Sequence, residues 1–195
     1  MNQKGFIKDL VIIVLAVLLL GGGYFYFSKK PAYAPAENQD QVSDWNVYID
    51  DMGGYSFKYP KDWERKSQGE GCGPVFAPKD NENVWLTVCG PYINPEDGTP
   101  QELAGRTISD GEKILSKEDL SLDGHSGVTQ ESVSGNEYEY ISFVGGVKSK
   151  VTIDGESANI RGTIGIYFYD QDDKDNTKDL KPLFKKIIYT FKFTK

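Results

Sequence analysis

Residues 10–27 form one uninterrupted apolar run, LVIIVLAVLLLGGGYFYF, without a charged side chain. As an α-helix, at about 1.5 Å per residue, the run would span about 27 Å, close to the hydrocarbon thickness of a bilayer. Lysines flank the run on both sides, and its last turn carries the aromatic residues that are enriched at membrane interfaces. The pattern predicts a transmembrane helix at residues 10–27, preceded by a short tail at residues 1–9.

Two interpretations of this helix differ in whether it is retained. A cleavable signal peptide normally has an apolar core of about 7–15 residues, closely followed by a small-residue cleavage site. Here the core is longer, Lys29 and Lys30 follow it, and Pro35 interrupts the candidate cleavage sites at residues 32–36. The sequence therefore favours an uncleaved signal anchor, with cleavage as the alternative.

A third interpretation is a type IV pilin-like leader. Gly5 and Phe6 ahead of an apolar helix resemble the prepilin pattern, in which cleavage falls between glycine and phenylalanine. That pattern also has a glutamate at the fifth mature position, where this chain has Leu10, and the only nearby acid is Asp9. A pilin helix continues well beyond the membrane, whereas Pro31 and later prolines end this one. A pilin-like structural subunit is the alternative function.

The remaining chain divides into a tether and one globular domain. Residues 28–44 are polar, contain prolines and show no periodicity, which predicts an extended linker. Residues 45–195 are long enough for one domain with its own core. Residues 31–195 hold 18 of the 22 Lys and Arg and 28 of the 29 Asp and Glu, a net charge of −10. This acidic balance disfavours nucleic acid and anionic lipid as partners of the domain.

Alternation of apolar and polar positions predicts a domain made mainly of strands. Within residues 55–59, Tyr55, Phe57 and Tyr59 share one face of a strand. Further strands are predicted at residues 75–77, 84–89, 126–132, 137–144, 148–153 and 158–170, with glycines in many of the turns between them.

Two helices accompany these strands. Residues 99–103 begin with a capping Thr99 and with Pro100 at the first helical position. Residues 177–189 carry apolar side chains at helical spacing, and Pro182 requires the helix to start no later than about residue 179. With a last strand at residues 190–193, the pattern predicts an α+β domain, an antiparallel sheet flanked by helices.

Two segments resemble the PsbP-like family. Residues 54–63, GYSFKYPKDW, are similar to the opening strand-and-tryptophan signature of that family, and residues 187–193, IIYTFKF, to its last helix-to-strand segment. Over residues 45–195 the resemblance implies a central antiparallel sheet flanked by helices and a non-enzymatic role in binding or assembly. It assigns no functional residue. The chain has no lipobox cysteine, so a helix rather than a lipid would anchor it.

The only two cysteines are Cys72 and Cys89. If residues 75–77 and 84–89 form a hairpin, the register that pairs Ala77 with Val84 also pairs Cys72 with Cys89. Opposed residues have Cβ atoms about 4.5–5.5 Å apart, so a small adjustment would allow a bond. The sequence predicts a disulfide formed in an oxidising compartment, with two unrelated buried thiols as the alternative. Because the lysine counts on the two sides of the helix are nearly equal, this bond decides the orientation in favour of a domain outside the cytoplasm.

Residues 170–179 hold five aspartates, yet they do not form an EF-hand. A frame that starts at Asp170 has Lys174 as its fifth residue and Asp175 in place of glycine, and a frame that starts at Asp173 also fails. A solvated loop before the helix is the favoured interpretation, with weak cation binding as the alternative.

The single histidine, His125, follows Asp123 and precedes Ser126, but sequence neighbours in a tight turn cannot form a catalytic triad. An exposed turn histidine is therefore expected. One histidine and two paired cysteines also argue against a zinc site. Neither Glu137 nor Glu139 has an evident reason for a raised pKa.

Aromatic residues are the last candidates for a site. Trp45, Trp63 and Trp85 are expected to fill the core, with a surface for sugars or peptides as the alternative. The sequence thus predicts a cell-membrane protein with an extracytoplasmic, non-enzymatic binding or envelope-assembly domain. No catalytic, cofactor-binding or metal-ligating residue and no cofactor are predicted, and an envelope protein is the expected partner.

Overall fold

The computed structural model describes residues 42–68, 72–92, 99–105, 111–153, 155–171 and 177–194. The tail at residues 1–9, the transmembrane helix predicted at residues 10–27 and most of the tether lie outside these ranges, as do Gly5 and Phe6 of the pilin-like alternative. Within the described ranges, no helix has the length and apolarity needed to cross a bilayer.

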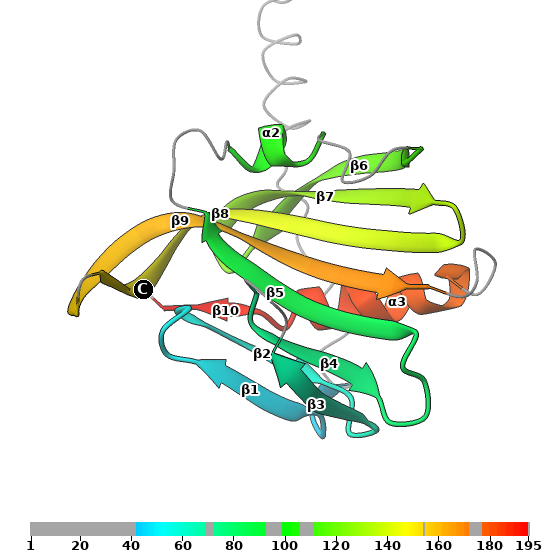
Figure 1. Ribbon diagram of the computed structural model, residues 1–195, viewed down its shortest axis with the longest axis horizontal. Coiled ribbons are helices and arrows are strands. Elements are labelled where there is room, and N and C mark those ends of the chain that lie inside the picture. Colours follow the sequence, from blue (N-terminus) through cyan, green and yellow to red (C-terminus); the bar gives the residue numbers. More distant parts are fainter. Residues whose placement is uncertain are drawn as a thin grey trace, which may run out of the picture. The chain divides into compact units, whose positions relative to one another are not determined.

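Two antiparallel sheets make up the described domain (Figure 1). The smaller has three strands in the order β1 (Asn46–Asp50), β2 (Tyr55–Tyr59) and β10 (Lys192–Phe193). The larger has seven strands in the order β3 (Trp63–Gln68), β4 (Pro74–Pro78), β5 (Val84–Tyr92), β9 (Glu156–Asp170), β8 (Glu137–Ile153), β7 (His125–Ser134) and β6 (Lys113–Leu122). The domain is therefore mainly antiparallel sheet with few helices, as predicted.

Helices pack on opposite faces of the seven-stranded sheet. The helix α3 (Thr177–Ile188) lies on the face that also contacts the three-stranded sheet, which we call the inner face. The short helix α2 (Pro100–Leu103) lies on the other face, which we call the outer face. The described outer-face residues used below are Trp85, Thr87, Cys89, Val128, Gln130, Ser132, Glu139, Ile141, Phe143, Tyr167 and Tyr169.

Local sequence explains both helices. Thr99 caps α2: its hydroxyl accepts a hydrogen bond from the Glu102 amide, and the Glu102 carboxylate accepts one from the Thr99 amide. The helix α3 begins at Thr177, and Pro182 lies within it. Its buried residues Phe184 and Ile187 pack into the inner core.

Aromatic rings form the centre of the inner core. Phe57 of β2 stacks on Phe191 at 4.6 Å between ring centroids and meets Phe76 of β4 edge-on at 5.2 Å. Tyr55 and Phe57 are buried and Tyr59 is half-buried, so the predicted alternation of β2 is confirmed. The three-stranded sheet therefore covers the inner face through the side chains that the alternation selects.

Glu131 of β7 joins α3 to the seven-stranded sheet. Its carboxylate accepts hydrogen bonds from Lys181 at 2.5 Å, Tyr138 at 2.8 Å and Ser116 at 2.9 Å. Burial alone would raise the pKa of Glu131, but these donors outweigh it and hold the pKa below its ordinary value. The carboxylate is thus a fixed structural charge beneath the helix.

The strand boundaries differ from the predicted ones in three places. Residues 137–144 and 148–153 belong to one strand, β8, because Gly145 and Gly146 lie at a register shift against β9 rather than in a turn. The strands β1, β3 and β6 were not predicted as strands from the pattern. The last strand is shorter than residues 190–193, since the Thr190 hydroxyl donates to the Ile187 carbonyl at the end of α3.

Candidate functional site

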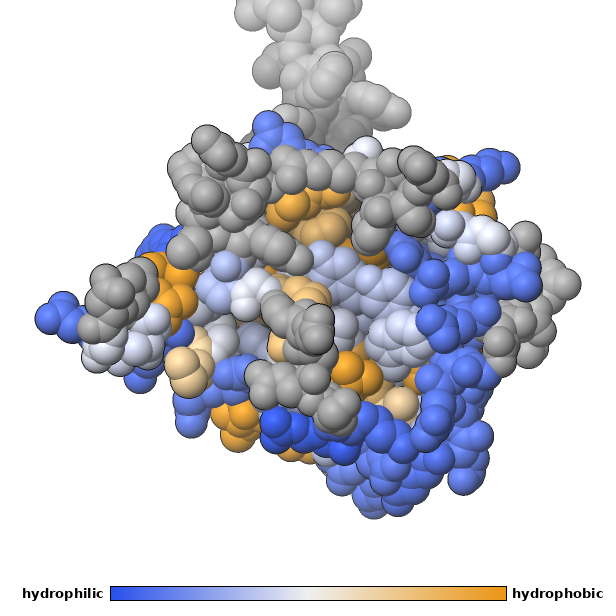
Figure 2. All heavy atoms as spheres, viewed as in Figure 1, coloured by the Kyte–Doolittle hydropathy of each residue, from blue (hydrophilic) through white to orange (hydrophobic). Residues whose placement is uncertain are grey.

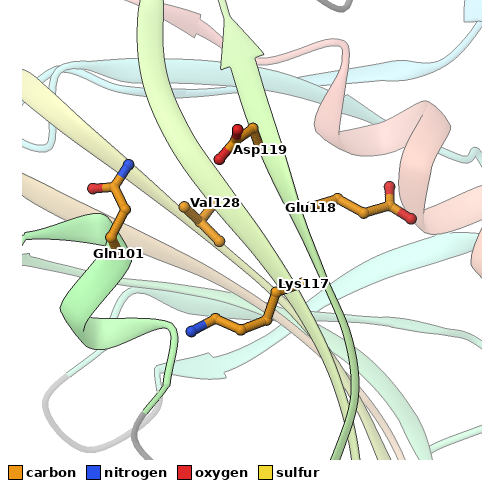
Figure 3. A pocket seen from close by; sticks show the side chains of 5 residues that line it. All are labelled: Gln101, Lys117, Glu118, Asp119 and Val128. Atoms are coloured by element: carbon orange, nitrogen blue, oxygen red, sulfur yellow. The ribbon is translucent and has the colours of Figure 1, made fainter.

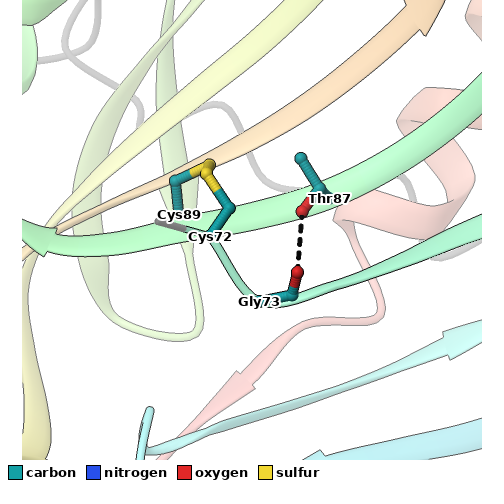
Figure 4. The surroundings of a disulfide bond; sticks show 4 residues. All are labelled: Cys72, Gly73, Thr87 and Cys89. Carbon is teal, nitrogen blue, oxygen red and sulfur yellow. Dashed lines mark hydrogen bonds between the residues drawn. A yellow bond between two sulfur atoms is a disulfide. The ribbon is translucent and has the colours of Figure 1, made fainter. Parts of the chain in front are cut away.

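A disulfide joins Cys72 to Cys89 at the edge of the outer face (Figure 4), as predicted. The two Cα atoms are 4.3 Å apart, and the two residues form an antiparallel bridge. Beside the bond, the Gly73 amide donates to the Val88 carbonyl at 2.8 Å, and the Thr87 hydroxyl donates to the Gly73 carbonyl at 3.4 Å. The bond therefore holds the chain before β4 against the end of β5.

The register of the β4–β5 hairpin differs from the predicted one. Phe76 pairs with Leu86, so Ala77 does not pair with Val84. The cysteine pair and the Phe76 pair belong to registers that differ by one residue. The prediction of the cysteine pair was right although its register was right only at that end of the hairpin.

A row of aromatic rings crosses the outer face. Trp85 of β5 stacks on Tyr169 of β9 at 5.1 Å, and Tyr169 stacks on Tyr167 at 6.1 Å. Phe143 of β8 meets Tyr167 edge-on at 5.9 Å. A Cβ at Gly165 would stand 2.4 Å from the Tyr167 ring, so only glycine lets that ring lie over the strand. Figure 2 shows weakly polar, pale residues gathered where β5, β9 and β8 run side by side.

The three tryptophans thus divide between core and surface. Trp63 is 3% exposed in the inner core, and Trp45 is half-buried against that core, as expected. Trp85 is half-buried on the outer face instead, stacked on the half-buried Tyr169. The core interpretation is wrong for Trp85 and right for the other two.

A buried carboxyl group lies in register with this aromatic row. Glu139 of β8 is 4% exposed, and it pairs across the sheet with Tyr169 on one side and with Ser132 on the other. The Ser132 hydroxyl donates to the Glu139 carboxylate at 3.4 Å. Burial, reinforced by the charges of Glu112 and Glu137, raises the pKa of Glu139 to about 7. The sequence interpretation, which expected no raised pKa here, is corrected by the burial of this side chain.

Gln130 adds a second buried polar group to the outer face. The side chain is 1% exposed, and its Oε1 atom has no hydrogen-bond partner in the described part of the chain. It lies on β7, two residues from Ser132 and opposite Lys117 of β6. The outer face therefore combines aromatic rings with buried acceptors.

A shallow groove of about 240 Å³ lies between α2 and β6 on the same side of the sheet (Figure 3). Gln101, Lys117 and Asp119 surround Val128 there, while Glu118 points away from them. The groove is smaller than the roughly 300–1,000 Å³ typical of enclosed small-molecule sites. An extended ligand or a protein surface suits this face better than an enclosed small molecule does.

His125 is half-buried at the start of β7, not exposed in a turn as expected. Its Nδ1 atom lies 3.0 Å from the Gly145 carbonyl, which can only accept, so Nδ1 carries the proton. The ring meets Phe193 edge-on at 4.9 Å. Asp123 accepts a hydrogen bond from the Phe193 amide at 2.9 Å, so both side chains hold β10 and form no triad with Ser126.

Replacing Asp123 by alanine should destabilise the domain by about 1–2 kcal/mol, because the Phe193 amide loses its acceptor. Asp123 also has a φ of 49°, a left-handed conformation that Asn tolerates better than Ala. Asp123→Asn is therefore the matched control and should retain most of the stability. Urea unfolding of both variants checks this, and equal losses would contradict the role of the acceptor.

The acidic segment at residues 170–179 is only partly described. Asp170 is 3% exposed at the end of β9, while residues 172–176 lie outside the described ranges. Among the residues that the structure describes, no group of three or more His, Cys, Asp or Glu could hold a metal ion. Cation binding by the full segment stays a prediction.

Comparison with known proteins gives matches in structure alone. No protein-family model matches the chain, and no curated protein matches it in sequence. The solution structure of cyanobacterial PsbP from Synechocystis is 21% identical, with a TM-score of 0.49 over 76% of this chain and 91% of that one. The chain is similar to a PsbP-like protein. That similarity is the one expected from residues 54–63 and 187–193.

Two further solved structures match. LpqN of Mycobacterium tuberculosis, described as involved in cell envelope biogenesis, is 14% identical, with a TM-score of 0.46 over 85% of this chain and all of that one. A structure from Bacteroides thetaiotaomicron is 16% identical, with a TM-score of 0.40 over 77% of this chain and 49% of that one. These similarities concern the backbone and identify no ligand or partner for this chain.

Proposed function

We propose that this chain is a membrane-anchored, extracytoplasmic and non-enzymatic binding domain of the cell envelope. Its binding surface is the outer face of the seven-stranded sheet, centred on Trp85 and Tyr169. The observation that carries this proposal is the half-buried aromatic row, which lies on an open face instead of filling the inner core.

The cellular location is supported by the disulfide and by the apolar run. Disulfides persist in oxidising compartments and are rare where thiols are kept reduced. The Cys72–Cys89 bond therefore suits a domain outside the cytoplasm. Residues 10–27 supply the anchor and residues 28–44 the tether that would hold the domain there.

The choice of ligand is supported by surface chemistry. Aromatic side chains are enriched in binding interfaces because they bury a large area with little loss of conformational entropy. The net charge of −10 over residues 31–195 disfavours anionic partners. The outer face therefore suits a neutral or basic partner, such as an envelope protein.

The lack of catalysis is supported by the burial of the one carboxyl with a strongly raised pKa among the described residues. Glu139 is 4% exposed and its hydrogen-bond donor Ser132 is 0% exposed, so a substrate could not contact either group. General acid–base catalysis requires such contact at about 2.6–3.2 Å. The raised pKa of Glu139 therefore affects stability and the charge of the face.

Trp85→Ala should lower the capture of a membrane partner at least about tenfold, as expected for a central aromatic residue of an interface. The detergent-solubilised full chain would be used as bait. Leu115→Ala is the control, because Leu115 is an exposed apolar residue of β6 outside the aromatic row. Equal capture by the Trp85→Ala protein, or turnover of a substrate by the purified protein, would overturn the proposal.

A further inference from the structure

Exposed apolar side chains are concentrated on β1 and the turn that follows it. Among the described residues, Val47 is 58% exposed, Ile49 is 65% exposed and Met52 is 58% exposed, while the other large exposed apolar residue, Leu115, lies on β6. Figure 2 shows apolar surface at the edge of the molecule where β1 lies in Figure 1. Such a cluster on one strand marks an interaction surface.

Lysines lie beside these apolar residues on the same side of the three-stranded sheet. Val47 pairs with Lys58 of β2, and Ile49 pairs with Ser56, which in turn pairs with Lys192 of β10. Opposed residues of antiparallel strands share a face, so Val47, Ile49, Ser56, Lys58 and Lys192 form one surface, which we call the β1 face.

A third lysine lies at the Met52 end of this surface. The Lys150 amide donates to the Met52 carbonyl at 2.7 Å, so the far end of β8 adjoins the turn after β1. The Lys150 side chain is exposed. Of the ion pairs in this region, Lys192 and Asp123 are 3.4 Å apart, and 66% of the Lys192 side chain stays exposed. Apolar and cationic groups therefore lie together on an otherwise acidic domain.

We propose that the β1 face docks on the surface of the bilayer that holds the predicted helix at residues 10–27. Apolar side chains of a peripheral surface enter the boundary between headgroups and acyl chains, and lysines beside them contact lipid phosphates. Docking rests on the membrane anchor of the proposed function. It adds a second, separable contact between the domain and the membrane.

The length of the tether supports this occupant of the β1 face. Residues 28–44 lead directly into β1, which is the first described strand after the predicted anchor. A flexible linker of that length has a root-mean-square span of about 23 Å, and it holds a tethered surface at an effective concentration in the millimolar range. A weak contact with the bilayer is therefore sufficient.

Local charge explains how an acidic domain approaches the bilayer through this face. Charges farther away than the Debye length of about 8 Å are largely screened at physiological ionic strength. Lys58, Lys192 and Lys150 adjoin the apolar residues, and Asp51 lies in the turn before Met52. The expectation against anionic lipid, which comes from the net charge of the whole domain, does not hold for this face.

Docking would also orient the proposed binding surface. The β1 face is the side of the three-stranded sheet turned away from the inner core, because Val47 and Ile49 are exposed while Tyr48 between them packs against that core. The outer face lies on the far side of the seven-stranded sheet. A domain docked through the β1 face would present Trp85 away from the membrane.

Lipid quenching tests the docking of the full chain. A fluorescent label on Ile49→Cys would be compared with the same label on Leu115→Cys in vesicles of phosphatidylcholine and phosphatidylglycerol that contain brominated lipid. Cys72 and Cys89 are paired, so only the new cysteine reacts. We expect quenching at position 49 to exceed quenching at position 115 several-fold, and a Lys150→Glu, Lys192→Glu background to abolish the difference.

Flotation of the same vesicles separates docking from anchoring. If the chain floats with the vesicles and both labels are quenched equally, docking is overturned while the anchor stands. If the chain does not float, the anchor and the docking that depends on it are both overturned. A label at position 49 that is shielded by a cross-linked protein, without lipid quenching, also overturns the proposal, because the β1 face would then bind a protein.

Discussion

Reducing the Cys72–Cys89 bond should lower the free energy of unfolding of the domain by about 3 kcal/mol. The two cysteines are 17 residues apart in the sequence, and the bond restricts the unfolded chain by closing that loop. The loop-closure entropy for this length gives the expected magnitude. Urea unfolding of the oxidised and reduced full chain in detergent measures the difference without changing any other side chain.

A Cys72→Ala, Cys89→Ala variant is the control for the reductant. Its stability should equal that of the reduced protein, apart from the small loss of packing at Cys89, which is 7% exposed. Adding reductant to this variant should change nothing. If oxidised and reduced wild-type proteins unfold at the same urea concentration, the bond does not stabilise the domain and the account of its role is wrong.

A fall in stability with rising pH should follow from Glu139. In the unfolded chain its pKa would be near the ordinary value of about 4.3, whereas in the folded domain the pKa is about 7. Between these values the folded state keeps a proton that the unfolded state loses, so the contribution is full below about pH 4.3 and lost as the pH rises through about 7. The loss approaches about 3 kcal/mol, at about 1.4 kcal/mol for each pKa unit.

Glu139→Gln should remove this slope, because the amide has the same shape and no charge to desolvate. The variant should be more stable than wild type above pH 7, by up to about 3 kcal/mol. Glu137→Gln is the matched control on the same strand and should keep most of the slope. Glu131, whose pKa is lowered, is ionised in both states throughout this window and adds no slope there. An unchanged slope in Glu139→Gln would contradict the account.

Sequence patterns predicted the fold where one face of a strand is buried. The alternation of Tyr55 and Phe57 follows from packing against the inner core, and it therefore needed no knowledge of the partner strands. The strand β6 was missed because it lies at the edge of the sheet, where most of residues 113–122 contact water and carry no apolar alternation. Gly145 and Gly146 predicted a turn because a bulge uses the same residues.

The candidate site could be predicted only in part. Glu139 is in phase with Ile141 and Phe143, a local signal that a carboxyl lies on a buried face. The charge of Glu112, which helps to raise its pKa, comes from a distant part of the sequence and has no local signal. The position of Trp85 likewise depends on which face of the seven-stranded sheet the three-stranded sheet covers, and that is a long-range feature.

The retained anchor and the oxidising location together are tested most directly by one intact-mass measurement. The protein would be extracted from membranes and alkylated without reductant before its mass is determined. We predict a chain that still contains residues 10–27, with two hydrogens fewer than the reduced form and no alkyl group on Cys72 or Cys89. A chain that begins at Phe6 or after the apolar run, or a chain with two alkylated cysteines, would contradict an anchored domain outside the cytoplasm.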